Sequence, residues 1–107
     1  MTASKIKQND TAPSLSVTLA QDGVVVDLTG ATVLFYMKDE VNNVLLADGT
    51  AVVTGATLGT VRYDWLASDT ALAGCFPAEF EVTLSDGKVE SFPNDNNLTI
   101  IITEDLA

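Results

Sequence analysis

The 107-residue sequence contains no histidine, one cysteine and only five basic residues against 15 acidic ones, which gives a net charge of −10. Without histidine, the chain cannot form a histidine-based catalytic triad or a histidine metal site. A single cysteine, Cys75, excludes both an internal disulfide and a cysteine-rich zinc site. The negative charge disfavours binding to nucleic acid and to anionic membranes, because both attract basic side chains.

Long apolar runs are also missing, so the sequence predicts no membrane-spanning helix. The first ten residues lack the apolar stretch of a secretory signal peptide. We therefore expect a protein that is made and kept in a cytoplasm, or assembled there into something larger. Apolar residues make up 47% of the chain, which is typical of a globular core and too high for a disordered acidic tail.

Apolar and polar residues alternate along most of the chain, as in strands that bury one face. The clearest alternation runs from Phe76 to Ser85. Shorter alternating runs cover residues 14–19, 32–37 and 61–65. Turn signals separate the runs, among them the Asp-Gly pairs at 22–23, 48–49 and 86–87. The spacing predicts about seven to nine short strands in a sandwich or barrel.

The apolar positions of these runs are the predicted core: Leu15, Val17, Leu19, Val33, Phe35, Val61, Tyr63, Trp65, Phe80, Val82, Leu84 and Ile100. Tyr36 is also expected to be buried with the other aromatic residues. Cys75 is expected to be a buried or half-buried inert thiol. The turn at 85–88 is expected to pair Leu84 with Val89 on the buried face. Residues 65–74 hold at most one helical turn and are expected to form a corner between the sheets.

No combination of residues in the sequence indicates an enzyme. Glu79 and Glu81 share one strand face, but a pair on the polar face of an amphipathic strand is more simply a solvated pair. Residues 55–59 hold two glycines without a following lysine, which is typical of a turn rather than a phosphate loop. Asp95 and its asparagine neighbours lack the ligand spacing of a calcium loop. We therefore expect no catalytic residue, no metal site and no cofactor.

Five segments carry a recognisable order and spacing: residues 5–14, 26–33, 59–65, 78–82 and 90–95. Together they resemble the N-terminal domain of the baseplate upper protein family of tailed bacteriophages and related short virion proteins. The resemblance covers about Lys5 to Thr103 and implies an all-β fold, an immunoglobulin-like antiparallel β-sandwich. It further implies a non-enzymatic virion structural protein, assembled in the host cytoplasm. The resemblance also implies an adaptor that binds other virion proteins in the tail or baseplate, often as a homo-oligomer.

The sequence contains no stalk or receptor-binding head, so a decoration or cement protein on the head or neck is a further expected role. The main alternative is a carbohydrate-binding or host-attachment module on the same fold. A sugar site needs one or two aromatic rings on the wet surface, so exposed rings would distinguish this alternative from the structural role.

We expect residues 1–13 to form an N-terminal arm or an edge strand, and residues 14–107 to form a single β-sandwich domain. The arm holds two of the five basic residues of an otherwise acidic chain. It is therefore suited to lie on an acidic face of a neighbouring copy or of a capsid protein. The predicted partner-binding residues are Lys5, Ile6, Lys7 and Gln8. The alternative is a frayed terminus with no binding role.

Overall fold

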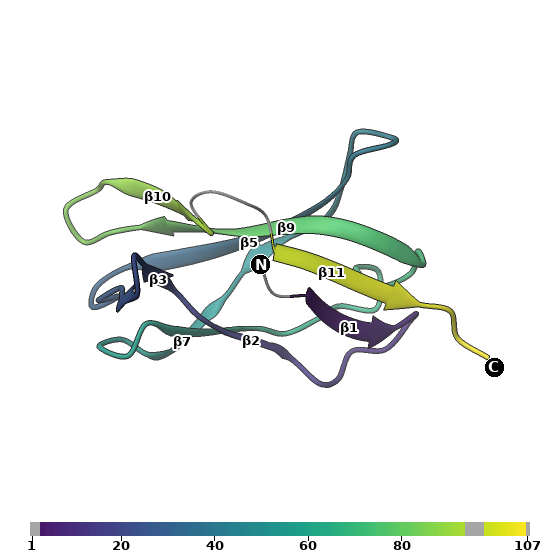
Figure 1. Cartoon of the computed structure of the whole chain (residues 1–107), viewed down its shortest axis with the longest axis horizontal. Coiled ribbons are helices and arrows are strands. Elements are labelled where there is room, and N and C mark those ends of the chain that lie inside the picture. Colours follow the sequence, from purple (N-terminus) through teal and green to yellow (C-terminus); the bar gives the residue numbers. More distant parts are fainter. Residues whose placement is uncertain (1–2, 94–97, 107) are drawn as a thin grey trace.

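A computed structural model, which describes residues 3–93 and 98–106, shows two packed β-sheets and a small hairpin (Figure 1). The strands of the larger sheet follow the order β1 (Ala3–Lys7), β11 (Leu98–Thr103), β9 (Gly74–Thr83), β5 (Thr32–Asp39) and β6 (Val44–Thr50), and β10 (Val89–Phe92) also pairs with β9. The smaller sheet has the order β2 (Leu15–Thr18), β8 (Thr60–Tyr63) and β7 (Val52–Gly55). The hairpin is β3 (Ala20–Gln21) with β4 (Val24–Val25).

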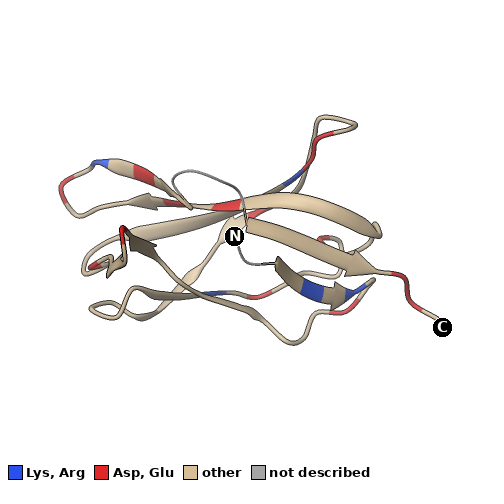
Figure 2. Cartoon of the chain, viewed as in Figure 1, with Lys and Arg blue, Asp and Glu red and all other residues tan. Residues whose placement is uncertain are grey.

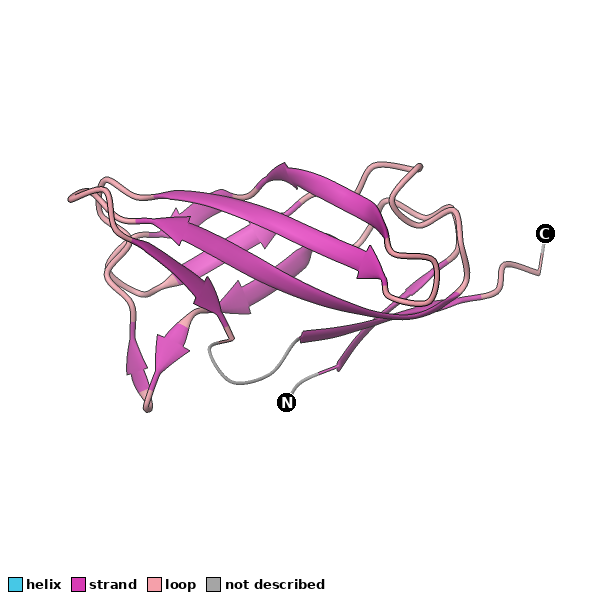
Figure 3. Ribbon diagram, turned by 90° about the horizontal axis from the view of Figure 1, so that it is seen from above, coloured by secondary structure: helices cyan, strands magenta, loops and turns pink. Residues whose placement is uncertain are grey.

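All strand pairs are antiparallel except β1 with β11, which run in the same direction. The described residues contain strands and loops but no helix (Figure 3). The chain crosses between the two sheets after β1, β6 and β8, and the β3–β4 hairpin lies on its return from β2 to β5. The last strand of the sandwich is split, because β10 pairs with one half of β9 and β11 with the other. The predicted all-β, immunoglobulin-like sandwich is confirmed.

The facing sides of the two sheets bury a cluster of aromatic rings. Phe35 of β5 stacks on Tyr63 of β8 with ring centroids 4.4 Å apart. Trp65 meets both rings edge-on, at 5.6 Å from Phe35 and 5.3 Å from Tyr63. Phe80 of β9 extends the cluster at 5.1 Å from Phe35. Every predicted core residue is buried except Val17 and Leu84, which are only partly buried.

The corner between β8 and β9 is held by a buried hydrogen bond. The Tyr63 hydroxyl donates to Oδ2 of Asp69 at 2.6 Å, and the backbone N–H of Leu66 donates to the same oxygen at 2.9 Å. Burial, together with Asp69, raises the pKa of Tyr63, so its hydroxyl stays protonated and keeps donating. A corner was predicted at residues 65–74; in the structure it covers residues 64–73 and contains no helical turn, because β9 already begins at Gly74.

Two sequence predictions about side-chain burial are wrong. Tyr36 lies between Phe35 and Met37, which both point into the core, so its ring is on the outer face and only half-buried. Cys75 precedes the buried Phe76 and is exposed on the outer face of β9. In both cases the neighbouring residue occupies the core position, and the alternation of the strand puts Tyr36 and Cys75 on the other side.

Two turn predictions also fail. The pair Asp48-Gly49 lies inside β6 and forms no turn. Its glycine leaves room for the Tyr63 ring, since a Cβ at Gly49 would be only 3.1 Å from Cε1 of that ring. The loop after Leu84 is one residue longer than a two-residue turn: Leu84 N–H donates to Lys88 O and Gly87 N–H donates to Leu84 O, both at 2.8 Å. Val89 therefore pairs with Thr83 and is exposed. The oxygen-rich segment around Asp95 lies outside the described residues.

Candidate assembly interface

Strand β1 forms one edge of the larger sheet, with β11 on one side and no strand of the described chain on the other. Its residues alternate between the core and the surface. Ile6 is 7% exposed and belongs to the core, whereas Lys5 and Lys7 are exposed on the outer face. Figure 2 shows blue, basic positions on β1. Neither lysine forms an ion pair with any residue that the structure describes. Within the described part of the chain, the edge therefore presents two positive charges that have no ion-pair partner.

The segment that follows β1 is tied to the corner between β8 and β9. The backbone N–H of Gln8 donates to Thr103 O at 2.7 Å, and its side-chain Nε2 donates to Ala71 O at 2.7 Å. Asn9 N–H donates to Thr70 O at 3.0 Å. Among the four predicted partner-binding residues, Lys5 and Lys7 are therefore exposed, while Ile6 and Gln8 make contacts inside the domain.

The outer face of the larger sheet continues from β1 across β11, β9, β5 and β6. Next to Lys5 the register places Ile101 of β11 and then Cys75 of β9. The next outward residue of β9 after Cys75 is Pro77. The outer face of β9 from Cys75 to Pro77 therefore carries no carboxylate. Ile101 and Pro77 are half-buried, so an apolar strip separates the lysines from the rest of the face.

Carboxylates collect farther along the same face. Glu79 of β9 lies opposite Tyr36, and Asp48 of β6 lies opposite Tyr36 on its other side. Burial and the charges of Glu81, Asp48 and Glu79 raise the pKa of Tyr36, so its phenol remains a neutral hydrogen-bond donor. The sequence analysis predicted that Tyr36 is buried, although the alternation of β5 contained the signal for its outward position, and it placed Asp48 in a turn instead of on this sheet.

A shallow groove of about 200 Å³ runs beside this tyrosine. It is lined by Tyr36, Lys38, Glu40, Leu45, Pro77, Ala78 and Glu79. The groove therefore combines one aromatic ring with charges of both signs, which can donate and accept hydrogen bonds.

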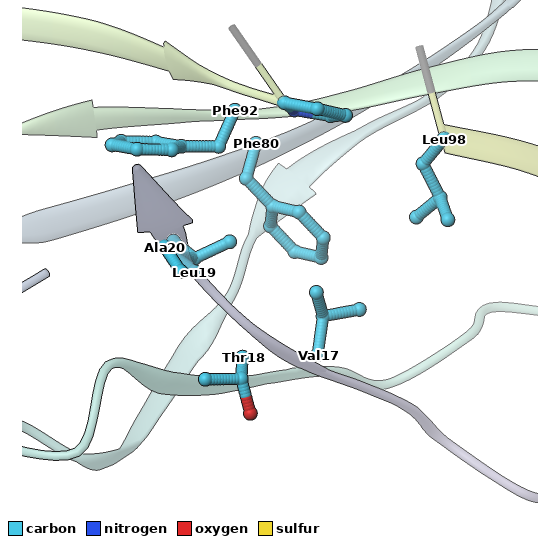
Figure 4. Close-up of a pocket in the computed structure, with 8 residues that line it drawn as sticks. Val17, Thr18, Leu19, Ala20, Phe80, Phe92 and Leu98 are labelled. Atoms are coloured by element: carbon cyan, nitrogen blue, oxygen red, sulfur yellow. The ribbon is translucent and has the colours of Figure 1, made fainter. Parts of the chain in front are cut away.

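A second cavity, of about 170 Å³, opens on the side of the sandwich between β2 and the split last strand (Figure 4). Val17 and Phe80 point toward each other across it from opposite sheets. Its lining is apolar apart from the Thr18 hydroxyl and the backbone, and the rings of Phe80 and Phe92 are almost completely buried. With no ionisable side chain in its lining, this cavity offers no group for acid–base or metal chemistry.

Residues 3–93 and 98–106 lack two kinds of feature. No three cysteine or acidic side chains converge there on a position that would hold a metal ion. No helix there is long and apolar enough to cross a membrane.

The strand order, the split last strand and the exposed face define an immunoglobulin-like β-sandwich domain. A family model described as the BppU N-terminal domain matches residues 2–106. The chain therefore belongs to the family of baseplate upper protein N-terminal domains. This membership indicates a bacteriophage structural protein that is located in the virion and interacts with other virion proteins.

The fold is shared with a solved structure from a different source. The crystal structure of CopC from Methylosinus trichosporium OB3b matches with a TM-score of 0.58 and 12% sequence identity, over 100% of this chain and 89% of that chain. At this identity the likeness concerns the fold alone. A comparison with curated proteins found no match.

Proposed function

We propose that the domain is a non-enzymatic adaptor that joins virion proteins in the tail, baseplate or head through the edge formed by β1. The observation that supports this most directly is the pair of exposed lysines on a strand whose outer edge pairs with no described strand, in a chain with a net charge of −10. The family membership supports the same role, because it indicates a component of the phage particle.

The edge combines two means of recognition. An edge strand presents backbone N–H and C=O groups that pair with an extended segment of another protein. Lys5 and Lys7 add a local positive charge that attracts an acidic surface and sets the orientation of the encounter. Since the hydrogen bonds of Gln8 hold the end of β1 against the domain, the edge is fixed before a partner arrives.

The test is the incorporation of variants into phage particles. We expect the Lys5→Ala/Lys7→Ala variant to be depleted about tenfold in purified particles, as loss of about 1.4 kcal/mol of binding would produce. Lys88→Glu is the matched control: it changes the net charge by the same two units, and Lys88 lies in the exposed hairpin loop between β9 and β10. Equal incorporation of the two variants would remove the β1 edge from the proposal.

A carbohydrate-binding or host-attachment role is a second candidate, supported by the groove at Tyr36. The half-buried ring lies beside the carboxylates of Glu40 and Glu79 and near Lys38, a combination that suits stacking on a sugar ring and bonding to its hydroxyls. Tyr36→Ala should then abolish binding of the purified domain to host cell envelopes, while Leu58→Ala, at an exposed position outside the groove, should not. Equal binding by both variants would exclude this candidate.

A further inference from the structure

We propose that the edge of β2 binds an extended, uncharged segment of another virion protein, which adds a strand to the smaller sheet and places one apolar side chain in the cavity between Val17 and Phe80. This inference goes beyond the proposed function, because it assigns a second contact at a different edge from β1. It is supported by the backbone of β2, by the composition of that edge and by the cavity that opens beside it.

The backbone of β2 has one side that pairs with no described strand. The smaller sheet has the order β2, β8, β7, so β2 is one of its edges. The Leu19 N–H donates to Gly59 O at 2.7 Å, in the same register that pairs the rest of β2 with β8. Because bonded and non-bonded pairs alternate between antiparallel strands, the N–H and C=O groups of Ser16 and Thr18 point away from β8. These groups are positioned to bond to an added strand.

The β2 edge lacks the features that usually keep edge strands from pairing with another chain. Residues 14–21 contain no charged residue and no proline, and the register of β2 with β8 is regular. The other edges of the two main sheets are different. Strand β1 carries two lysines, β6 carries Asp48 and a register shift against β5, β7 has a register shift against β8, and β10 carries Glu90. Since charges, prolines and bulges protect edges, the bare edge of β2 is typical of a strand that a partner covers.

The cavity of about 170 Å³ opens between this edge and the larger sheet. Figure 4 shows Val17 pointing toward Phe80 across the cavity, whereas the side chain of Thr18 lies on the other side of β2. The described part of β1 begins opposite Thr99, so it does not reach the level of Phe80 along the sheet. The apolar lining is therefore not covered by β1.

An added strand would place one side chain directly into this cavity. In an antiparallel pair that bonds to Ser16 and Thr18, the residue between those bonds lies opposite Val17 and points to the same face, between the two sheets. An apolar cavity of about 150 Å³ is large enough to hold benzene. The cavity therefore has room for one leucine, isoleucine or phenylalanine side chain. The residues on either side of it would point outward, beside the hydroxyls of Ser16 and Thr18.

The charges around the cavity favour an uncharged segment. The lining contains no ionisable side chain, and Glu90, which shares the inner face of β10 with Phe92, lies outside the lining. A charged side chain inserted there would lose its hydration without gaining a partner in the lining. The net charge of −10 repels an acidic segment, and a basic segment would find no carboxylate among residues 14–21. An uncharged segment meets none of these costs.

The first test removes a backbone donor from the edge. Thr18→Pro deletes one outward N–H and leaves the bonds between β2 and β8, as is usual for proline in edge strands. We expect this variant to be depleted at least about tenfold in purified phage particles, as loss of about 1.4 kcal/mol of binding would produce. Thr18→Ala is the matched control, because it keeps the N–H, and it should be incorporated like the wild type. The midpoint of thermal unfolding of each purified domain shows whether the fold is retained.

The second test fills the cavity from within. Val17→Phe occupies the space that the partner's side chain needs, and cavity-filling substitutions usually retain or stabilise the fold. We expect the same depletion in particles without a lower unfolding midpoint. Val52→Phe, on the outer face of β7 at the other edge of the same sheet, is the control and should be incorporated normally. Depletion of Val17→Phe with normal incorporation of a folded Thr18→Pro would overturn the proposal in favour of a small apolar molecule in the cavity. Normal incorporation of Val17→Phe would overturn it outright.

The third test identifies the occupant of the edge. A photoreactive diazirine amino acid is encoded at position 16, and irradiated particles are digested and analysed by mass spectrometry. We expect cross-links to an uncharged segment of another virion protein, and no cross-link to that segment from position 54 on β7. Cross-links to a second copy of this chain or to a charged segment would overturn the proposal, and so would the absence of any cross-link.

These outcomes separate the inference from the proposed function. If Lys5→Ala/Lys7→Ala is depleted in particles while Thr18→Pro and Val17→Phe are incorporated normally, the β1 edge stands as the means of attachment and the β2 edge does not. If the β2 variants are depleted and the lysine variant is not, the added strand stands and the β1 edge is not the means of attachment.

Discussion

Replacing Trp65 with Ala should lower the free energy of unfolding by about 3–5 kcal/mol, the usual cost of deleting a large buried aromatic side chain. Trp65 is only 6% exposed, and its ring meets Phe35 and Tyr63 edge-on. The expected loss is a large share of a total stability of about 5–15 kcal/mol. The variant should therefore be folded only at low temperature.

The magnitude can be expressed as a melting temperature. Unfolding entropy of about 2.1 cal/mol/K per residue gives about 0.22 kcal/mol/K for a chain of this length, so the midpoint should fall by about 14–22 °C. The assay is thermal unfolding followed by circular dichroism or calorimetry, because the variant lacks the tryptophan that fluorescence would report.

The neighbouring position supplies the control for this experiment. Leu66 is 62% exposed, and Leu66→Ala removes apolar volume without opening the core. Its midpoint should stay within about 2 °C of the wild type, as is usual for surface substitutions. A fall of less than about 5 °C for Trp65→Ala would refute the reasoning, because it would mean that the aromatic cluster is not the centre of the core.

Two further predictions concern the backbone and the carboxylates. Gly59→Ala should be destabilising by about 2 kcal/mol or more in urea unfolding, because Gly59 has a φ of 69° and a Cβ there would lie 2.7 Å from Leu19 O. Gly23→Ala, at a φ of 80° with nothing within 4 Å of the added Cβ, should cost about 1 kcal/mol, and an equal cost for both would contradict the clash. Hydrogen bonds from Ser14 and Arg62 lower the pKa of Asp64, so its ionised form favours the folded state at neutral pH, and this contribution is lost as the pH falls below the ordinary value of about 3.9. The difference in unfolding free energy between wild type and Asp64→Asn should therefore shrink from pH 7 to pH 3 in urea titrations, and a constant difference would show that the lowered pKa does not stabilise the fold.

The strands could be predicted from the sequence because burial on one face imposes a period of two. The aromatic core of Phe35, Tyr63, Trp65 and Phe80 follows directly from that period. The same rule also predicts the outward position of Tyr36, but the expectation that aromatic rings are buried led to the opposite conclusion. Position within the strand decides burial here, and the chemistry of the side chain does not.

The turns were predictable only where local chemistry decides them. Asp22-Gly23 forms a tight turn with both residues at positive φ, as its sequence predicts. Asp48-Gly49 has the same sequence, but its glycine is required by the Tyr63 ring of the other sheet. That contact joins residues far apart in the chain, so nothing near Gly49 in the sequence could indicate it.

The candidate site depends even more on contacts between distant residues. The positive charge of Lys5 and Lys7 is visible in the sequence, but their neighbours are not. The parallel pairing of β1 with β11 joins the first and last strands and places Lys5 beside Ile101. The composite face that includes Cys75 and Glu79 exists only once this pairing and that of β9 have formed.

The direction of this pairing also determines how the domain responds to force. Ala3 pairs with Thr99 and Lys7 with Thr103, so the chain enters at one end of the pair and leaves at the other. A pull on the two ends of the chain loads the hydrogen bonds between β1 and β11 along the strands, so that they must slide and break together rather than open one after another. A module built in this way resists traction that is applied between the two ends of the strand pair.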